Sequence, residues 1–313
     1  MNLELRPLTI GELFDRAFTL FRRNLWMFAG VAALPAVLAA AVGIVTQIMQ
    51  RIALAGVAGA EASADAVART VTATLVFGGA VLILSLAYWV VYMIALGATT
   101  YAVSELYVGR PSTVRQAYAG IRGRIGALIV LMLLIGVRFA ILFIAGGASL
   151  ALLGGLGGFV HALVSAAVLI VGGLALFAIF MFMALRYGLA VPAIVVEGLT
   201  PGEAIKRSIE LTKGRLGRVF LLVLCAMIVT YATMMIFQMP FTIGAMVLDP
   251  LSPLGFWLNI AGAVFGAVGS TFTTPFLIIG LALLYYDARI REEGFDLQLT
   301  LEALDARAGV ARV

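Results

Sequence analysis

Long apolar stretches constrain the fold of this chain more than any other feature of its sequence. A helix needs about 20 apolar residues to cross the hydrocarbon core of a bilayer, and six stretches reach that length. They are Leu25–Met49, Val71–Gly97, Ile125–Leu153, Phe159–Leu185, Val219–Leu248 and Phe256–Tyr286. We therefore predict an all-α fold, a polytopic membrane helical bundle with six transmembrane helices.

The composition indicates that lipid, rather than water, surrounds most of the chain. Hydrophobic residues make up 63% of it and charged residues 12%, whereas soluble domains average about 45–50% and about 25%. A soluble fold of this length hides only about 75% of its surface, which is too little to bury the excess. A water-soluble globular protein is therefore excluded.

Prolines mark the places where the spans are expected to bend. Pro35, Pro240 and Pro275 fall inside the first, fifth and sixth stretches, and a proline inside a helix removes a hydrogen bond and kinks it. The fourth stretch continues as apolar sequence to about Val196. We expect this extension to bend at Pro192.

The distribution of basic residues predicts the orientation. Four precede the first span, four lie between the second and third, five lie between the fourth and fifth, and four follow the sixth. The opposite side has two, Arg51 and Arg69, in the first external loop. Because lysine and arginine accumulate on the cytoplasmic side, we expect both the N- and the C-terminus in the cytoplasm.

The cytoplasmic segments resemble one another. Residues 8–12 (LTIGE) match residues 199–203 (LTPGE) at an offset of 191, and residues 122–126 (RGRIG) match residues 213–217 (KGRLG) at an offset of 91. We infer three two-span repeats within a single membrane domain. The domain covers 1–313, the repeats cover about 8–108, 109–198 and 199–290, and a cytoplasmic tail covers 287–313.

Each repeat is expected to begin with a short amphipathic helix, followed by a span, a turn and a second span. Thr9 and Thr200 start two of these helices, with Glu12 and Glu203 three residues on to close a capping box. Apolar side chains share one face of the first helix, so we expect an interfacial helix in the head-group plane. The alternative is that it packs on the ends of the spans. The glycines of residues 154–158 are expected to form a turn.

Basic residues next to these short helices are candidate contacts for anionic phospholipids. Each basic residue near an anionic leaflet contributes about 1 kcal/mol to membrane binding. The candidates are Arg22, Arg23, Arg122, Arg124, Lys213 and Arg215. The partners that we expect are the lipid bilayer, its anionic phospholipids and other membrane proteins, and not nucleic acid.

Two arginines, Arg138 and Arg186, fall inside predicted spans. An arginine at the centre of a span costs about 2.5–3.5 kcal/mol on insertion scales, so its presence needs a reason. One interpretation is a buried cationic site for an anion or a lipid phosphate. The other is that each guanidinium reaches the interface or binds helix carbonyls, and Pro192 would free such carbonyls near Arg186.

The chain offers little for catalysis. His161 is its only histidine and Cys225 its only cysteine, while general acid–base and nucleophilic catalysis need titratable groups held side by side. Asp287, Glu292 and Glu293 follow the last span and are expected to belong to a solvated charged tail. We predict that the protein is not an enzyme and needs no cofactor or metal.

Four segments resemble the membrane-domain family named after glycerophosphoryl diester phosphodiesterase. They are residues 5–15 (LRPLTIGELFD), 186–198 (RYGLAVPAIVVEG), 204–208 (AIKRS) and 285–291 (YYDARIR). The resemblance implies a multi-pass protein of the bacterial cytoplasmic (inner) membrane. Arg186 and Glu197 match positions typical of this family, which favours a structural role for them.

The enzymes that give the family its name carry a separate soluble phosphodiesterase domain. Only 27 residues follow Tyr286, so we expect the membrane part without that domain. The function that we expect is a non-enzymatic scaffold or accessory factor, with basic residues on anionic lipid. The alternative is a transporter or permease for a small anion or lipid head group that uses Arg138 or Arg186.

Overall fold

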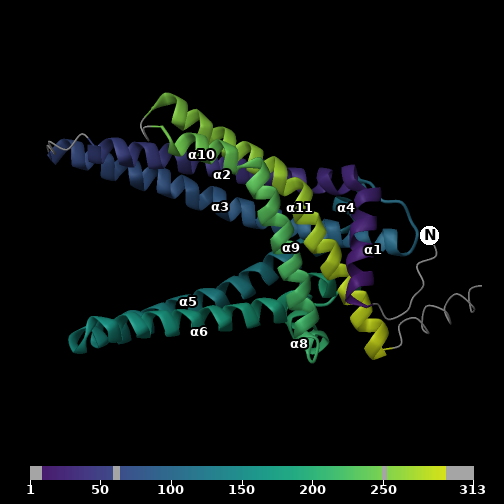
Figure 1. Ribbon diagram of the computed structural model, residues 1–313. Coiled ribbons are helices and arrows are strands. Elements are labelled where there is room, and N and C mark those ends of the chain that lie inside the picture. The colour runs from purple at the N-terminus through teal and green to yellow at the C-terminus, as the bar shows by residue number, and fades with distance from the viewer. Residues whose placement is uncertain (1–8, 59–63, 249–251, 294–313) are drawn as a thin grey trace, which may run out of the picture. The chain divides into compact units, whose positions relative to one another are not determined.

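The computed structural model describes residues 9–58, 64–248 and 252–293. This part of the chain is built of helices and contains no strand (Figure 1). In chain order the elements are α1 (Ile10–Arg23), α2 (Leu25–Ala58), α3 (Ala64–Tyr107), α4 (Val114–Gly120), η1 (Arg122–Arg124), α5 (Ile125–Val160), α6 (Ala162–Tyr187), α7 (Ala190–Pro192), η2 (Ala193–Glu197), α8 (Pro201–Thr212), α9 (Leu216–Phe237), α10 (Met239–Met246) and α11 (Pro253–Glu293). They form two compact units, the first made chiefly of residues 10–122 and 222–280, the second of residues 123–221 and 281–293.

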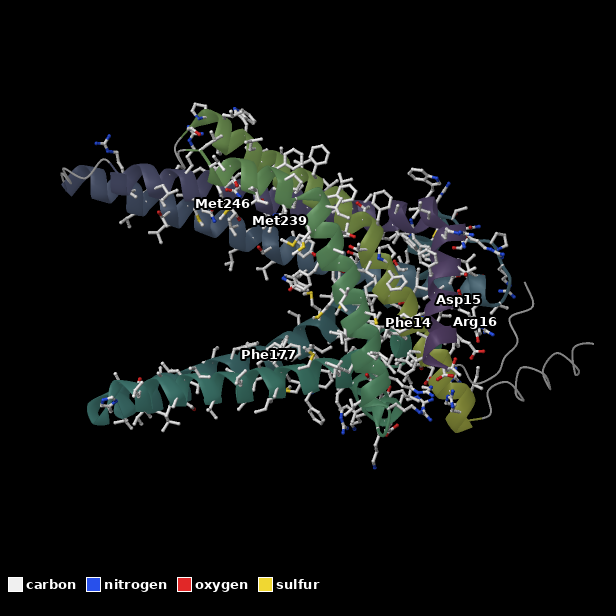
Figure 2. All side chains as sticks on the ribbon, viewed as in Figure 1. Phe14, Asp15, Arg16, Phe177, Met239 and Met246 are labelled. Carbon is white, nitrogen blue, oxygen red and sulfur yellow. The ribbon has the colours of Figure 1, made fainter. Side chains whose placement is uncertain are left out.

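Six helices of the described residues have the length and apolar composition of a membrane span, which confirms the multi-pass prediction. They are α2, α3, α5, α6 with its extension to Glu197, α9 and α11. Large apolar side chains on these helices are exposed, among them Ile144 at 72% and Leu163 at 73%. In Figure 2 the side chains along α5 and α6, with Phe177 labelled, are almost all carbon. Hydrocarbon is the solvent that such a surface matches.

The first unit contains a hairpin of α2 and α3, which lie side by side (Figure 1). Pro35 lies inside α2, as the sequence predicts. A proline has no N–H, so the carbonyl four residues earlier, that of Val31, loses its helical donor. The Tyr118 hydroxyl on α4 donates to this carbonyl at 2.8 Å. This hydrogen bond to the freed carbonyl fixes α4 to the end of the hairpin.

The second unit contains a hairpin of α5 and α6, and here the prediction of a glycine-rich turn is wrong. Residues 154–158 are helical, and the chain reverses at His161, whose backbone is extended with a φ of −168°. The Nδ1 of His161 caps α6 by accepting from the Leu163 N–H at 3.1 Å. Gly157 serves packing instead, because a Cβ at this position would lie 3.2 Å from the backbone nitrogen of Ser165.

The fifth predicted span is also shorter than the sequence suggested. It was expected to run to Leu248 with a kink at Pro240, but α9 ends at Phe237 and a separate helix, α10, begins at Met239. Pro240 lies in the first turn of α10. At that position its missing N–H is one that no helix satisfies anyway, so the proline begins a new helix rather than kinking an old one.

The fourth span breaks near Pro192, as predicted, but one turn earlier. α6 ends at Tyr187, and α7 and the π-helical η2 carry the chain on to Glu197. The ring of a proline clashes with the carbonyl four residues before it, which here belongs to Gly188. The helix therefore opens at Gly188 rather than at the proline itself.

Candidate functional site

The second unit contains charged side chains that converge on Glu197, the last residue of η2. Its Oε1 accepts from the Nη2 of Arg207 on α8 at 3.2 Å and from the Tyr285 hydroxyl on α11. The Nε of Arg289, on the next turn of α11, lies 3.3 Å from the same oxygen. We call these four residues the Glu197 cluster. Its three charged side chains are only 15–21% exposed, so water screens them weakly.

The local sequence explains why Arg207 returns to Glu197. Gly198 follows η2 with a φ of 70°, a conformation that favours glycine and ends a helix. Thr200 and Glu203 then form the predicted capping box at the start of α8. The Glu203 carboxylate accepts from the Thr200 hydroxyl at 2.7 Å and from its N–H at 3.0 Å, and these hydrogen bonds lower the pKa of Glu203. The chain therefore reverses between η2 and α8, which brings Arg207 back to Glu197.

Ser208, on α8, bonds to the backbone where α6 breaks. It is fully buried. Its hydroxyl donates to the Arg186 carbonyl at 2.6 Å and accepts from the Leu189 N–H at 3.1 Å. The break between α6 and α7 leaves such groups without helical partners, and a buried unpaired group costs about 1–3 kcal/mol. One hydroxyl therefore satisfies both sides of the break.

Asp287 anchors a second group of charges in the same unit, and the prediction that it belongs to a solvated tail is wrong. Its side chain is fully buried, with an oxygen 3.0 Å from the Nη1 of Arg218 on α9 and 3.0 Å from the Nε of Arg291. α11 continues to Glu293, so Asp287 is a helical residue. An acidic residue four positions before an arginine on one helix is placed to pair with it. Residues 294–313 of the predicted tail lie outside the described residues.

The structure divides the six candidate lipid contacts into two kinds. Two of them donate to backbone carbonyls within the second unit, Arg124 to Val195 and the Nη1 of Arg215 to Ala288 at 3.3 Å. The other four are exposed: Arg22, Arg23, Arg122 and Lys213. Arg124 and Arg215 therefore hold the backbone of the second unit together, whereas the other four basic side chains lie on the surface.

The two arginines inside spans have different surroundings. The Nη1 of Arg138 donates to the Leu134 carbonyl of its own helix at 2.9 Å, as the second interpretation of its sequence position expects. Arg186 lies over the Phe182 ring, with its guanidinium carbon 4.9 Å from the ring centre. Its Nε is buried and has no hydrogen-bond acceptor. The same interpretation expects its guanidinium to bind carbonyls freed by Pro192, and its Nε makes no such bond.

Sequence reasoning did not assign a role to several residues of these clusters. Tyr285, Arg289, Arg207 and Ser208 all lie within segments that carry the family resemblance, and that resemblance was the available signal. Arg218 has no such signal. Its partner is 69 residues away in the chain, and no local pattern joins the two.

The arrangement is suited to holding helices together. Each carboxylate, on Glu197 and on Asp287, faces two guanidinium groups. Carboxylates paired in this way have few lone pairs left for a substrate.

Comparisons with known proteins give one family. Neither the curated proteins nor the solved structures give a significant match. Residues 158–301 match the family described as the membrane domain of glycerophosphoryl diester phosphodiesterase. This region contains η2, α8, α9 and the whole of α11, and hence both groups of ion pairs. The family resemblance predicted from the sequence is thereby confirmed over residues 158–301, which are similar to this membrane-domain family.

Proposed function

We propose that this protein is a non-enzymatic scaffold or accessory factor of the bacterial inner membrane, with exposed basic residues on anionic lipid. The observation that carries this proposal is that arginines pair with the partly buried carboxylate of Glu197 and with the buried carboxylate of Asp287. The polar interior of the second unit is therefore a brace between helices. The family match supports the same conclusion, since it is to a membrane domain and not to a catalytic one.

Four exposed basic residues form what we call the basic collar: Arg22, Arg23, Arg122 and Lys213. We assign the collar to the cytoplasmic side, because lysine and arginine accumulate there. Two large aromatic side chains near its first two members are exposed, Phe18 at 54% and Trp26 at 80%. Aromatic and basic side chains on one surface favour the boundary between head groups and acyl chains, which supports an interfacial position for α1.

Three short helices support the proposed threefold repeat. α8 begins with a capping box of Thr200 and Glu203, and α4 begins with one of Thr113 and Gln116. Thr9 stands before α1 in the same relation to Glu12. A threonine followed three residues later by glutamate or glutamine thus precedes α1, α4 and α8. The alternative, in which these short helices pack on the ends of the spans, applies to part of their surface, because α8 buries Ala204, Ile205 and Leu211.

Arg186 favours one second candidate, transport of a small anion or a lipid head group. Its buried Nε lacks an acceptor, and an unpaired buried donor is costly. A phosphate or carboxylate would satisfy it.

One reconstitution separates the two functions. The purified protein is placed in liposomes of phosphatidylglycerol and phosphatidylcholine, and the lipid carried through a second purification is analysed. Replacing the four collar residues by glutamine is expected to abolish most of the enrichment in phosphatidylglycerol, at about fivefold per residue. A variant with lysine at Arg22, Arg23 and Arg122 keeps the charge and is the matched control.

Flux and crosslinking complete the test. The scaffold predicts no uptake of labelled phosphate or glycerol phosphate by these liposomes, and it predicts that crosslinking in native membranes captures a defined set of envelope proteins. Uptake that is lost in Arg186→Ala would replace the scaffold with the transporter.

A further inference from the structure

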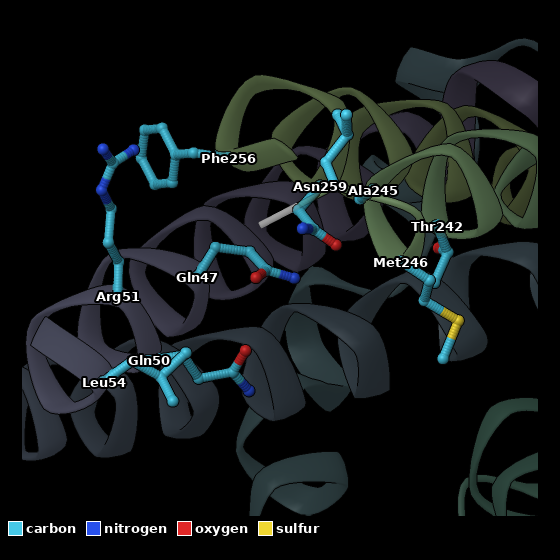
Figure 3. A pocket seen from close by; sticks show the side chains of 10 residues that line it. Gln47, Gln50, Arg51, Leu54, Thr242, Ala245, Met246, Phe256 and Asn259 are labelled. Atoms are coloured by element: carbon cyan, nitrogen blue, oxygen red, sulfur yellow. The ribbon is translucent and has the colours of Figure 1, made fainter. Parts of the chain in front are cut away.

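A pocket of about 320 Å³ lies in the first unit, where the C-terminal part of α2 meets α10 and the start of α11 (Figure 3). Its volume falls in the range of small-molecule sites, roughly 300–1,000 Å³. Ten residues line it: Gln47, Gln50, Arg51, Leu54, Thr242, Ala245, Met246, Leu248, Phe256 and Asn259. Neither the sequence analysis nor the proposed function gives this pocket a role.

One side of the pocket is polar. Gln47, Gln50 and Arg51 fall at positions i, i+3 and i+4 of α2, which places them on one face. Figure 3 shows the carboxamides of Gln47 and Asn259 turned toward each other. The guanidinium of Arg51 lies over the Phe256 ring, with its carbon 4.6 Å from the ring centre. Of the ten lining residues, Arg51 is the one that carries a charge.

The position of the pocket along the helices matches the head-group region. Gln47 lies 22 residues after Leu25, where α2 begins, which is roughly 33 Å at 1.5 Å per residue. The hydrocarbon core is about 30 Å thick. α9, the span that leads to α10, is itself 22 residues long. The pocket therefore lies at the membrane surface opposite to the start of α2.

The other side of the pocket is apolar and open. Leu54, Ala245, Leu248 and Met246 contribute to it, and Met246 is 80% exposed. An amphiphile fits this division, with a hydrogen-bonding head against the amides and acyl chains along the apolar side. A guanidinium and carboxamide N–H groups donate to phosphate oxygens, and the single positive charge favours a head group with net negative charge.

We propose that this pocket binds the phosphate head group of an anionic phospholipid. Arg51 supplies the charge, and Gln47 and Gln50 supply further donors. The leaflet rests on the proposed function, in which the basic collar lies on the cytoplasmic side, so the bound lipid belongs to the outer leaflet. The binding itself does not depend on that orientation.

A photoactivatable phosphatidylglycerol in liposomes that hold the full-length protein tests the proposal. The labelled peptides are mapped by mass spectrometry in the variant whose four collar residues are glutamine, so that lipid on the collar does not contribute. Labelling of residues 47–54 and 239–259 is expected. Arg51→Gln is expected to lower it about tenfold, because a charged hydrogen-bond donor is lost. Arg69→Gln, which removes a positive charge from α3 outside the pocket, is expected to leave it unchanged.

Further arms distinguish the possible outcomes. Excess unlabelled phosphatidylglycerol should abolish labelling of the pocket, and glycerol 3-phosphate should not; equal competition would overturn the lipid assignment in favour of a free phosphate ester. Equal losses in Arg51→Gln and Arg69→Gln would overturn the pocket. Gln50→Leu, at an exposed position, removes a donor but no charge and should lower labelling by itself if Arg51→Gln does not fold. If the wild-type protein binds phosphatidylglycerol through its collar as expected, but the pocket of the collar variant is not labelled, this inference is refuted and the proposed function is left intact.

Discussion

At the scale of single residues, Glu197 is the acceptor for donors from two other helices. Its carboxylate faces Arg207, Arg289 and the Tyr285 hydroxyl. Removing one partner from a fully buried ion pair costs about 3–5 kcal/mol, because the other charge stays buried. The charged side chains of the Glu197 cluster retain some exposure, so a smaller cost, about 2 kcal/mol, applies here.

Glu197→Gln is therefore expected to lower the Tm of the detergent-solubilised protein by roughly 5 °C. The variant keeps the shape of the side chain and removes its charge, which leaves Arg207 and Arg289 without their counterion. Glu210→Gln removes the same charge from the exposed side of α8 and is the matched control. Equal Tm values for the two variants would show that the Glu197 cluster does not hold the helices together.

Rarity was the signal that the sequence offered at the residue scale. Arg138 and Arg186 were singled out because arginines are rare in spans, and both make unusual contacts. The acceptors could not be predicted, because the partners are far apart in the chain. The Tyr285 hydroxyl and Glu197 are 88 residues apart, and Arg124 and the Val195 carbonyl are 71 apart.

At the scale of elements, the break between α6 and α7 depends on one hydroxyl. Ser208→Ala is expected to leave the Leu189 N–H and the Arg186 carbonyl unpaired, at a cost of about 1–3 kcal/mol. Hydrogen exchange of the Leu189 amide should accelerate by roughly tenfold or more. Ser149→Ala is the control, since the Ser149 hydroxyl is exposed and bonds only the Ala145 carbonyl of its own helix. Unchanged exchange at Leu189 would mean that Ser208 does not support the break.

The elements themselves were predictable as far as hydropathy determines them. Each of the six apolar stretches overlaps a long helix of the structure. The errors fall where packing decides the local conformation. Gly157 lies within α5, where a Cβ would meet the backbone of Ser165, and Pro240 lies in the first turn of a separate helix. Asp287 is buried against Arg218, which is 69 residues away in the chain. The contact between Asp287 and Arg218 cannot be read from the local sequence.

At the scale of the whole molecule, two features are decisive. The first is the lipid-facing surface of six long helices, and the second is the side of the membrane that the connections between these helices occupy. The first follows from length and composition. The second follows from the positive-inside rule alone, and it determines whether the basic collar meets the anionic cytoplasmic leaflet. The orientation is therefore the central claim.

Labelling of single cysteines by a membrane-impermeant thiol reagent tests this claim most directly. Cys225 is the only cysteine, so Cys225→Ser provides a background for Arg115→Cys, Lys213→Cys, His161→Cys and Val247→Cys. In intact cells the orientation predicts labelling of the variants at 161 and 247, and labelling of those at 115 and 213 only after permeabilisation. Labelling of 115 and 213 in intact cells, with 161 and 247 protected, would contradict the account.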